Sequence, residues 1–225
     1  MRDQLLEIAC FNAQSALIAA ANGAQRIELC SNKEADGLSP AFETCAELLP
    51  LLDIPVTIMI RPRAGNFCYT EAEFLQMQNT LQRFKLLPIN GFVFGILNED
   101  TSINIAQNAQ LIEMAQPLPC TFHKAFDVCE DLETSLETLI QLGFKNVLTS
   151  GGAASALEGV AQLKLLNERA QGKINILVGG SVRSNNLETL KDLTGINHYH
   201  SSAVTNGSEI CDAVEIQNMR KVLEN

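Results

Sequence analysis

Short apolar runs alternate with longer amphipathic stretches along the whole chain. The runs have the length and composition of buried strands and predict strands at residues 5–10, 26–30, 55–62, 91–97, 120–127, 146–150, 174–178 and 198–203. The stretches between them predict helices at about 12–23, 39–49, 70–86, 105–115, 132–142, 155–170, 186–193 and 211–223. Asn12, Ser39, Thr70 and Ser155 are predicted helix N-caps, and the last two are followed by glutamate at the capping-box position.

The strict alternation of strands and helices predicts the fold. Near-continuous apolar strands separated by helices are typical of a parallel sheet whose faces are covered. Eight strand–helix units in 225 residues give about 28 residues per unit, which suits a compact closed barrel. No linker or shift in composition marks a domain boundary. The sequence therefore predicts an α/β fold, a single (β/α)8 TIM-like barrel domain over residues 1–225.

The predicted strand at 120–127, with the sequence CTFHKAFD, carries more titratable groups than a buried strand tolerates. Its alternation puts Thr121, His123, Ala125 and Asp127 on one face and Lys124 with two phenylalanines on the other. A charge that is buried without a partner is strongly destabilising. The stretch therefore predicts a solvent-filled mouth or a functional site, with His123 and Asp127 in one cavity.

In a (β/α)8 barrel the C-terminal ends of all strands meet at one rim, where the loops that follow them build the site. Polar residues interrupt the apolar runs near these ends on every predicted strand except the one at 91–97. Unrelated strands would not be expected to lose their apolar character at the same end. We therefore predict a functional rim, with candidate residues Glu7, Glu28, Arg61, Arg63, His123, Asp127, Ser150, Gly151, Gly180, Ser181, His200 and Ser202.

Two arginines predict an anion site at this rim. Arg61 and Arg63 share a face of an extended strand and are expected to clamp a carboxylate or phosphate with paired donors. Glu7 and Glu28 are expected to neutralise them, and such a buried cluster shifts pKa values enough to make either glutamate an acid or a base.

The remaining candidates predict acid–base chemistry and anion binding. His123, oriented by Asp127 or by a glutamate, is the candidate general acid–base group near neutral pH. Glycine-rich turns after the sixth and seventh strands, with polar residues after the eighth, resemble the phosphate sites of barrels. We therefore expect a small anionic or phosphorylated ligand to contact Ser150, Gly151, Gly180, Ser181, His200 and Ser202.

Each of these interpretations has a structural alternative. The arginine–glutamate cluster also has the composition of a satisfied ionic layer inside a barrel. The alternative for His123 is a hydrogen-bonded core histidine, which the nearby Asp127 and arginines disfavour, and tight turns explain part of the glycine pattern. His198 and His200 share a strand face, but no carboxylate or thiolate spacing accompanies them, which favours a structural pair over a metal site.

Composition excludes several classes of function. The net charge of -10 argues against nucleic-acid or anionic-membrane partners, and no apolar run is long enough to span a bilayer. The first residues lack a signal-peptide pattern, so we expect a cytoplasmic protein. Seven cysteines without a C-x-x-C motif fit neither a disulfide framework nor a zinc ribbon. No motif indicates an organic cofactor.

Several segments resemble the CutC copper-homeostasis family. They are residues 6–10 (LEIAC), 23–30 (GAQRIELC), 37–40 (GLSP), 59–67 (MIRPRAGNF), 91–95 (GFVFG), 121–127 (TFHKAFD) and 148–151 (LTSG). The resemblance runs in order from about residue 6 to residue 203, and the arginine and histidine segments are specific. It implies a (β/α)8 barrel, a cytoplasmic setting, assembly into a homo-oligomer and a link to copper handling.

Copper binding requires suitable ligands. Cu(I) prefers two or three converging thiolate or thioether donors. Cys10 and Cys30 end adjacent predicted strands and are the natural pair. Strand alternation opposes them, however, because Glu7 and Cys10 fall on opposite faces whereas Cys30 shares a face with Glu28.

Two hypotheses follow from the sequence. The first is a cytosolic CutC-type protein of copper homeostasis, with Cys10 and Cys30 as candidate Cu(I) ligands. The second is a barrel enzyme acting on a small anionic metabolite, with the His123–Asp127 pair as acid–base group and the arginines as anion clamp. The sequence leaves open whether the protein is an enzyme.

Overall fold

Eight strands pair in chain order and close on themselves in the computed structural model, which describes residues 4–205 and 207–224. They are β1 (Leu5–Cys10), β2 (Arg26–Leu29), β3 (Val56–Met59), β4 (Gly91–Phe94), β5 (Cys120–Phe122), β6 (Asn146–Thr149), β7 (Asn175–Val178) and β8 (His198–Ser201). Neighbouring strands are parallel, and β8 pairs with β1 to complete the barrel. The predicted (β/α)8 barrel is confirmed.

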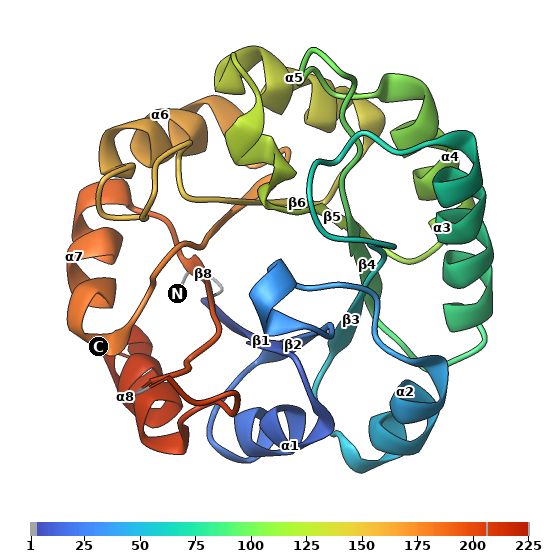
Figure 1. Cartoon of the computed structure of the whole chain (residues 1–225). Coiled ribbons are helices and arrows are strands. Elements are labelled where there is room, and N and C mark those ends of the chain that lie inside the picture. The colour runs from blue at the N-terminus through green and yellow to red at the C-terminus, as the bar shows by residue number, and fades with distance from the viewer. Residues whose placement is uncertain (1–3, 206, 225) are drawn as a thin grey trace.

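A ring of helices surrounds the strands, as the view along the barrel shows (Figure 1). They are α1 (Ala13–Ala21), α2 (Phe42–Leu48), α3 (Glu71–Phe84), α4 (Ile105–Ala115), α5 (Leu132–Leu142), α6 (Val160–Ala170), α7 (Ser184–Thr194) and α8 (Ala213–Glu224). The main hydrophobic core lies between strands and helices, where Leu6 and Ile8 of β1 are fully buried with Ala16 and Ala19 of α1. Within the described ranges, no helix combines the length and apolar character needed to cross a bilayer.

Two of the predicted caps begin their helices as expected. Asn12 accepts a hydrogen bond from the backbone N–H of Ser15 at 2.8 Å, and Thr70 forms a reciprocal capping box with Glu73. The other two differ from the prediction. The helix expected at 39–49 begins at Phe42 because the Ser39 hydroxyl bridges the backbone of Arg61, accepting from its N–H at 2.8 Å and donating to its carbonyl at 3.1 Å.

The other difference follows β6. Ser155 accepts from the N–H of Glu158 at 3.3 Å, but this turn is separate from α6, which begins at Val160 after Gly159. An ideal Cβ on Gly159 would lie 1.8 Å from the carbonyl oxygen of Ser150, so only glycine fits here. The close approach ties the start of α6 to the end of β6.

The predicted strand at 120–127 is wrong in its second half. β5 ends at Phe122, and the chain turns into the 3-10 helix η3 (Lys124–Val128), with His123 as its N-cap. The turn satisfies the polar groups locally, because Nδ1 of His123 accepts from the N–H of Ala125 at 3.2 Å. The predicted shared face of His123 and Asp127 therefore does not exist.

The inward-facing side chains form polar levels. Near the strand starts, Asn146 donates to Thr121 at 2.9 Å, and Asn175 donates to Asn146 at 2.9 Å. Closer to the C-terminal ends, Glu7 on β1 lies in register with Arg26 on one side and His200 on the other. A satisfied amide layer therefore underlies a charged layer.

Candidate functional site

A cavity of about 810 Å³ opens at the C-terminal ends of the strands. Residues at or after the ends of β1, β2, β3, β5, β6, β7 and β8 line it. The 3-10 helix η1 (Lys33–Ala35) and the residue after it contribute Glu34, Ala35 and Asp36; this blue segment lies over the middle of the barrel in Figure 1. The predicted site residues among the lining are Glu28, Arg61, His123, Asp127, Gly180, Ser181, His200 and Ser202.

The charged layer at the base of this cavity joins four residues. Nδ1 of His200 lies 2.7 Å from Oε1 of Glu7, whose other oxygen forms an ion pair with Nε of Arg26. Nε2 of His200 lies 3.8 Å from Oε2 of Glu28. The glutamates are 1% and 3% exposed, so this network is removed from bulk water. Glu7 and Glu28 neutralise Arg26 and His200. Their pairing with Arg61 and Arg63, which was predicted from the sequence, is therefore wrong.

The two glutamates have opposite pKa shifts. Burial by itself raises the pKa of Glu7, but the charge of Arg26 and the hydrogen bond from His200 outweigh it and lower this pKa to about 2. Burial raises the pKa of Glu28 to about 7, with His200 opposing and Glu7 adding to the shift. Burial lowers the pKa of His200, but the neighbouring carboxylates of Glu28 and Glu7 raise it overall.

His123 is buried at the cavity wall, but it is not poised to titrate near neutral pH. Burial, followed by the positive charge of Arg61, lowers its pKa to about 3. Its ring packs against that of Phe67, with centroids 4.9 Å apart and planes tilted by 54°, and its Nε2 has no hydrogen-bond partner among the described residues. The structure therefore differs from the prediction of a general acid–base histidine: His123 is a neutral imidazole with one unused nitrogen.

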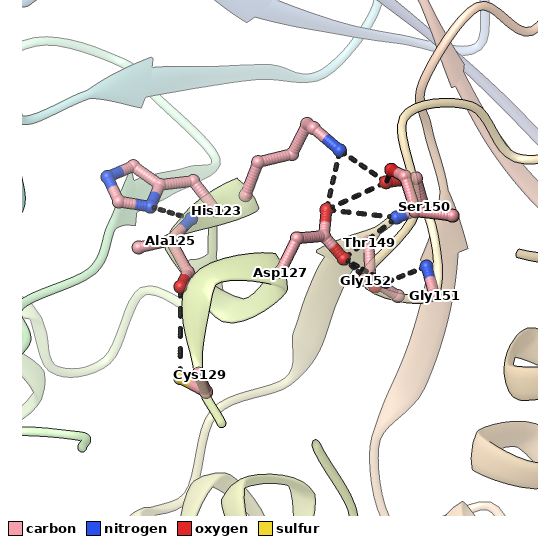
Figure 2. Close-up of polar contacts among 10 residues, drawn as sticks. His123, Ala125, Asp127, Cys129, Thr149, Ser150, Gly151 and Gly152 are labelled. Atoms are coloured by element: carbon pink, nitrogen blue, oxygen red, sulfur yellow. Dashed lines mark hydrogen bonds and ion pairs between the residues drawn. The ribbon is translucent and has the colours of Figure 1, made fainter. Parts of the chain in front are cut away.

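Asp127 turns away from His123 and toward the loop after β6 (Figure 2). Its carboxylate accepts from the hydroxyl of Thr149, from the N–H of Ser150 at 3.0 Å and from the N–H of Gly152 at 2.9 Å. Lys124 donates to the same carboxylate at 2.5 Å. Asp127 is thus a structural anchor of the β6–α6 loop, and the predicted His123–Asp127 pair is wrong.

Arg61 is a buried cation without a carboxylate partner in ion-pair range among the described residues. Its guanidinium donates to the carbonyls of Ala35 at 2.5 Å, Gly37 at 3.0 Å and Gly65 at 3.2 Å. It is 5% exposed and lines the cavity, and its Nε has no hydrogen-bond partner in the described ranges. Backbone carbonyls hold the group in place without neutralising its charge.

Arg63 does not join Arg61 in an anion clamp. Its guanidinium donates to the carboxylate of Glu73 at 2.5 and 3.4 Å and to the carbonyls of Ala64, Asn66 and Cys68. These bonds use every N–H that an arginine side chain offers. The predicted pair fails because β3 ends at Met59, so the two arginines lie in a loop and no longer share a strand face.

The predicted glycine-rich turns divide into two groups. Gly180, Ser181 and Ser202 line the cavity. Ser150 and Gly151 are not part of its described lining: Ser150 is fully buried against Asp127, and Gly151 donates to the hydroxyl of Thr149 at 2.8 Å.

Two cations at this end of the barrel were missed by the sequence interpretation. Arg26 could have been found from strand alternation, because it lies two residues before Glu28 on the same inward face. Arg183 lies at the cavity after β7, where it donates to the hydroxyls of Ser201 at 3.0 Å and Ser202 at 3.3 Å. No residue spacing marks it in advance.

The two candidate copper ligands lie on opposite sides of the barrel wall. Because β1 runs through Cys10, the side chain of Cys10 is buried in the outer core, where its Sγ donates to the carbonyl of Ile8 at 3.6 Å. Cys30 packs inside the barrel mouth with Met59 and Val93, in a separate cluster. The predicted Cys10–Cys30 pair is therefore not formed by two side chains of one cavity. Burial raises the pKa of each thiol well above its ordinary value.

Comparisons with known proteins agree over nearly the whole described chain. A model of the CutC family matches residues 4–205. A CutC family protein of Proteus mirabilis strain HI4320 is 43% identical over 198 residues, which cover 88% of this chain and 78% of the relative. The human copper homeostasis protein cutC homolog is 40% identical over 199 residues, covering 88% of this chain and 73% of the relative. The crystal structure of CutC from Streptococcus agalactiae has a TM-score of 0.85 at 32% identity, covering 90% of this chain and 100% of that one.

Proposed function

Since this chain belongs to the CutC family, we propose that it takes part in copper homeostasis and binds Cu(I) in the mouth of its barrel. The observation that carries the copper site is a pair of sulfur residues on the inner side of adjacent strands. Cys30 directly follows β2, Met59 ends β3, and the two side chains pack in one buried cluster. Met59 also lines the cavity, which gives the ion a path of entry.

The donors suit the ion. Thiolate and thioether sulfur are the ligands that Cu(I) prefers. Burial destabilises the thiolate form of Cys30 and raises its pKa. A thiolate that binds Cu⁺, however, forms a neutral unit, which is not destabilised by burial in this way. The loop at Gly37 closes over both side chains: an ideal Cβ there would lie 3.5 Å from Sγ of Cys30 and 3.6 Å from Cε of Met59. The site therefore shields Cu(I) from solvent.

Anaerobic Cu(I) titration of the reduced protein against a competing chelator tests this proposal. We expect one tightly bound equivalent in the wild type, its loss in Cys30→Ser, and about tenfold weaker binding in Met59→Leu, equivalent to about 1.4 kcal/mol. Cys10→Ser is the matched control and keeps wild-type affinity. If Cys10→Ser loses Cu(I) as Cys30→Ser does, the thioether assignment is wrong and the two cysteines act together.

A second candidate function, binding of a small anion, rests on Arg61. A buried guanidinium that has no carboxylate in ion-pair range within the described part of the chain, and that faces a cavity of about 810 Å³, favours an anionic occupant. We expect phosphate to raise the thermal midpoint of the wild type and of Arg63→Lys, but not that of Arg61→Gln. Equal stabilisation of all three proteins would exclude the Arg61 site. The cytoplasmic location and the homo-oligomer stay predictions from the sequence.

A further inference from the structure

Below Cys30 and Met59, the imidazole of His200 and the carboxylate of Glu28 face each other without a hydrogen bond. Nε2 of His200 lies 3.8 Å from Oε2 of Glu28, which is beyond hydrogen-bonding distance. The other oxygen of Glu28, Oε1, is buried and has no partner among the described residues. Buried polar atoms without partners are rare in folded proteins and call for an explanation. Both residues line the cavity, so a ligand can reach the space between them.

The orientation of the His200 ring is fixed by its hydrogen bond with Glu7. Oε1 of Glu7 holds Nδ1 of His200 at 2.7 Å, which leaves Nε2 directed at Glu28. Histidines that bind metals characteristically give their other ring nitrogen to a carboxylate in this way. Donor atoms of Glu7, Glu28 and His200 all lie within 4.8 Å of one another. Glu7 thus supports His200 in the way that an outer carboxylate supports a metal-binding histidine, and Glu28 lies where a second metal ligand would lie.

The distribution of charge assigns separate roles to the two glutamates. Both oxygens of Glu7 are occupied, one by His200 and one by the guanidinium of Arg26, so Glu7 is neutralised and supports its neighbour. Glu28 has no such ion pair with an arginine or lysine among the described residues. Arg26 forms its ion pair with Glu7 and acts on Glu28 only through its charge.

We propose that Glu28 and His200 form an open site for a divalent transition-metal ion of the zinc type, with Glu7 as the residue that positions His200. Two donors about 2.1 Å from a tetrahedral ion lie about 3.4 Å apart, so the observed separation of 3.8 Å closes with a small side-chain rotation. Imidazole nitrogen and carboxylate oxygen suit Zn²⁺, whereas Cu(I) prefers the sulfur pair above. Because both residues line the cavity, further ligands would reach the ion from there.

Cobalt(II) is the probe, because its visible absorption bands report the coordination geometry, whereas Zn²⁺ has no visible absorption bands. Isothermal titration of the full-length wild type with Co²⁺ should give one equivalent, together with the intense visible bands of four-coordinate cobalt. Glu28→Gln and His200→Gln should lose this equivalent. Glu7→Gln should weaken it by about 10–100-fold, the usual effect of removing an outer carboxylate, and should shift the visible bands, which a purely structural change would not do.

Two control variants separate this site from its surroundings. Glu43→Gln, at an exposed glutamate of α2, should bind Co²⁺ like the wild type, and so should Cys30→Ser. Unchanged Co²⁺ binding in both Glu28→Gln and His200→Gln would overturn the proposal. A sulfur-to-cobalt charge-transfer band that disappears in Cys30→Ser would also overturn it and move the ion to the thiol.

The site can also be tested if a variant does not fold. The thermal midpoint of the wild type should rise with Co²⁺ concentration, because an ion that binds only the native state stabilises it. Cys30→Ser should show the same rise while it loses Cu(I). A wild type that shows neither a rise nor visible bands at millimolar Co²⁺ has no such site, whatever the outcome of the Cu(I) titration.

Discussion

Replacing Asp127 with asparagine tests whether this residue anchors a loop or serves His123. One carboxylate oxygen accepts from Thr149 and Gly152, and the other accepts from Lys124 and the N–H of Ser150. Asparagine keeps one acceptor but puts an NH2 group where the second oxygen faced two donors. The substitution therefore removes the contact with Lys124 and one of the two bonds from the N–H of Ser150, which also reaches the first oxygen at 3.1 Å, and it places an NH2 donor against the ammonium of Lys124.

The magnitude follows from these contacts. Asp127 has a side chain that is 10% exposed, and a buried hydrogen bond to a charged group contributes about 1.5–3 kcal/mol. The ion pair adds little, because Lys124 is 43% exposed and water screens it. We expect Asp127→Asn to lower the free energy of unfolding by about 2–3 kcal/mol, and the thermal midpoint by roughly 5–10 °C in a protein of this size.

Urea unfolding and amide hydrogen exchange are the assays. The N–H groups of Ser150 and Gly152 should lose protection in Asp127→Asn, while the imidazole signals of His123 stay unchanged. Asp131→Asn is the matched control: Asp131 caps α5 from the surface, where asparagine caps equally well, so its thermal midpoint should match the wild type. A loss below about 0.5 kcal/mol, the range of ordinary surface substitutions, together with a changed His123 signal, would refute the anchor and favour the pair suggested by the sequence.

Three further outcomes test the same structure. Gly95→Ala should cost about 1–3 kcal/mol in thermal unfolding, as overpacking does, because a Cβ at Gly95 would lie 2.7 Å from Nδ1 of the buried His123. Arg63→Lys should lower the thermal midpoint, because lysine cannot form the paired bonds to Glu73, yet leave phosphate stabilisation unchanged. Glu7, whose pKa falls from 4.5 to about 2 on folding, contributes about 3 kcal/mol that is present above pH 4.5 and lost as pH falls through 2; Glu7→Gln should flatten this acid limb in pH-dependent unfolding.

The barrel could be predicted because its determinants are local. Each strand is an apolar run and each helix an amphipathic stretch, and eight such units leave few alternative architectures. The predicted ends of helices and strands were wrong where side-chain hydrogen bonds to the backbone changed the path of the chain. Ser39 bonds to the backbone of Arg61 and does not cap α2, and the groups of residues 123–127 turn the chain after β5. Alternation cannot reveal where a ladder of hydrogen bonds stops.

The membership of the rim was predictable, but its pairings were not. Barrel geometry brings the ends of the strands together, so Glu28, Arg61, His123 and His200 do meet at one cavity. Which groups touch depends on register. Glu7 has Arg26 and His200 as its partners because they stand opposite it on both neighbouring strands. The sequence does not reveal the height at which each side chain lies along the barrel axis. The predicted pairing of Glu7 and Glu28 with Arg61 and Arg63 was therefore wrong.

Strand alternation is also the reason why the two proposed metal sites lie at separate levels of one barrel. Glu28 in β2 and Cys30 directly after it are two residues apart and both face inward, so this segment presents a carboxylate at one level and a thiol at the next. Met59 on the adjoining strand β3 is the second donor at the upper level, and His200 on β8, which is separated from β2 by β1, is the second donor at the lower level. Hard and soft ligands are thus stacked along one wall. If ion softness governs binding, Cys30→Ser must remove Cu(I) and spare Co²⁺, and Glu28→Gln must do the reverse.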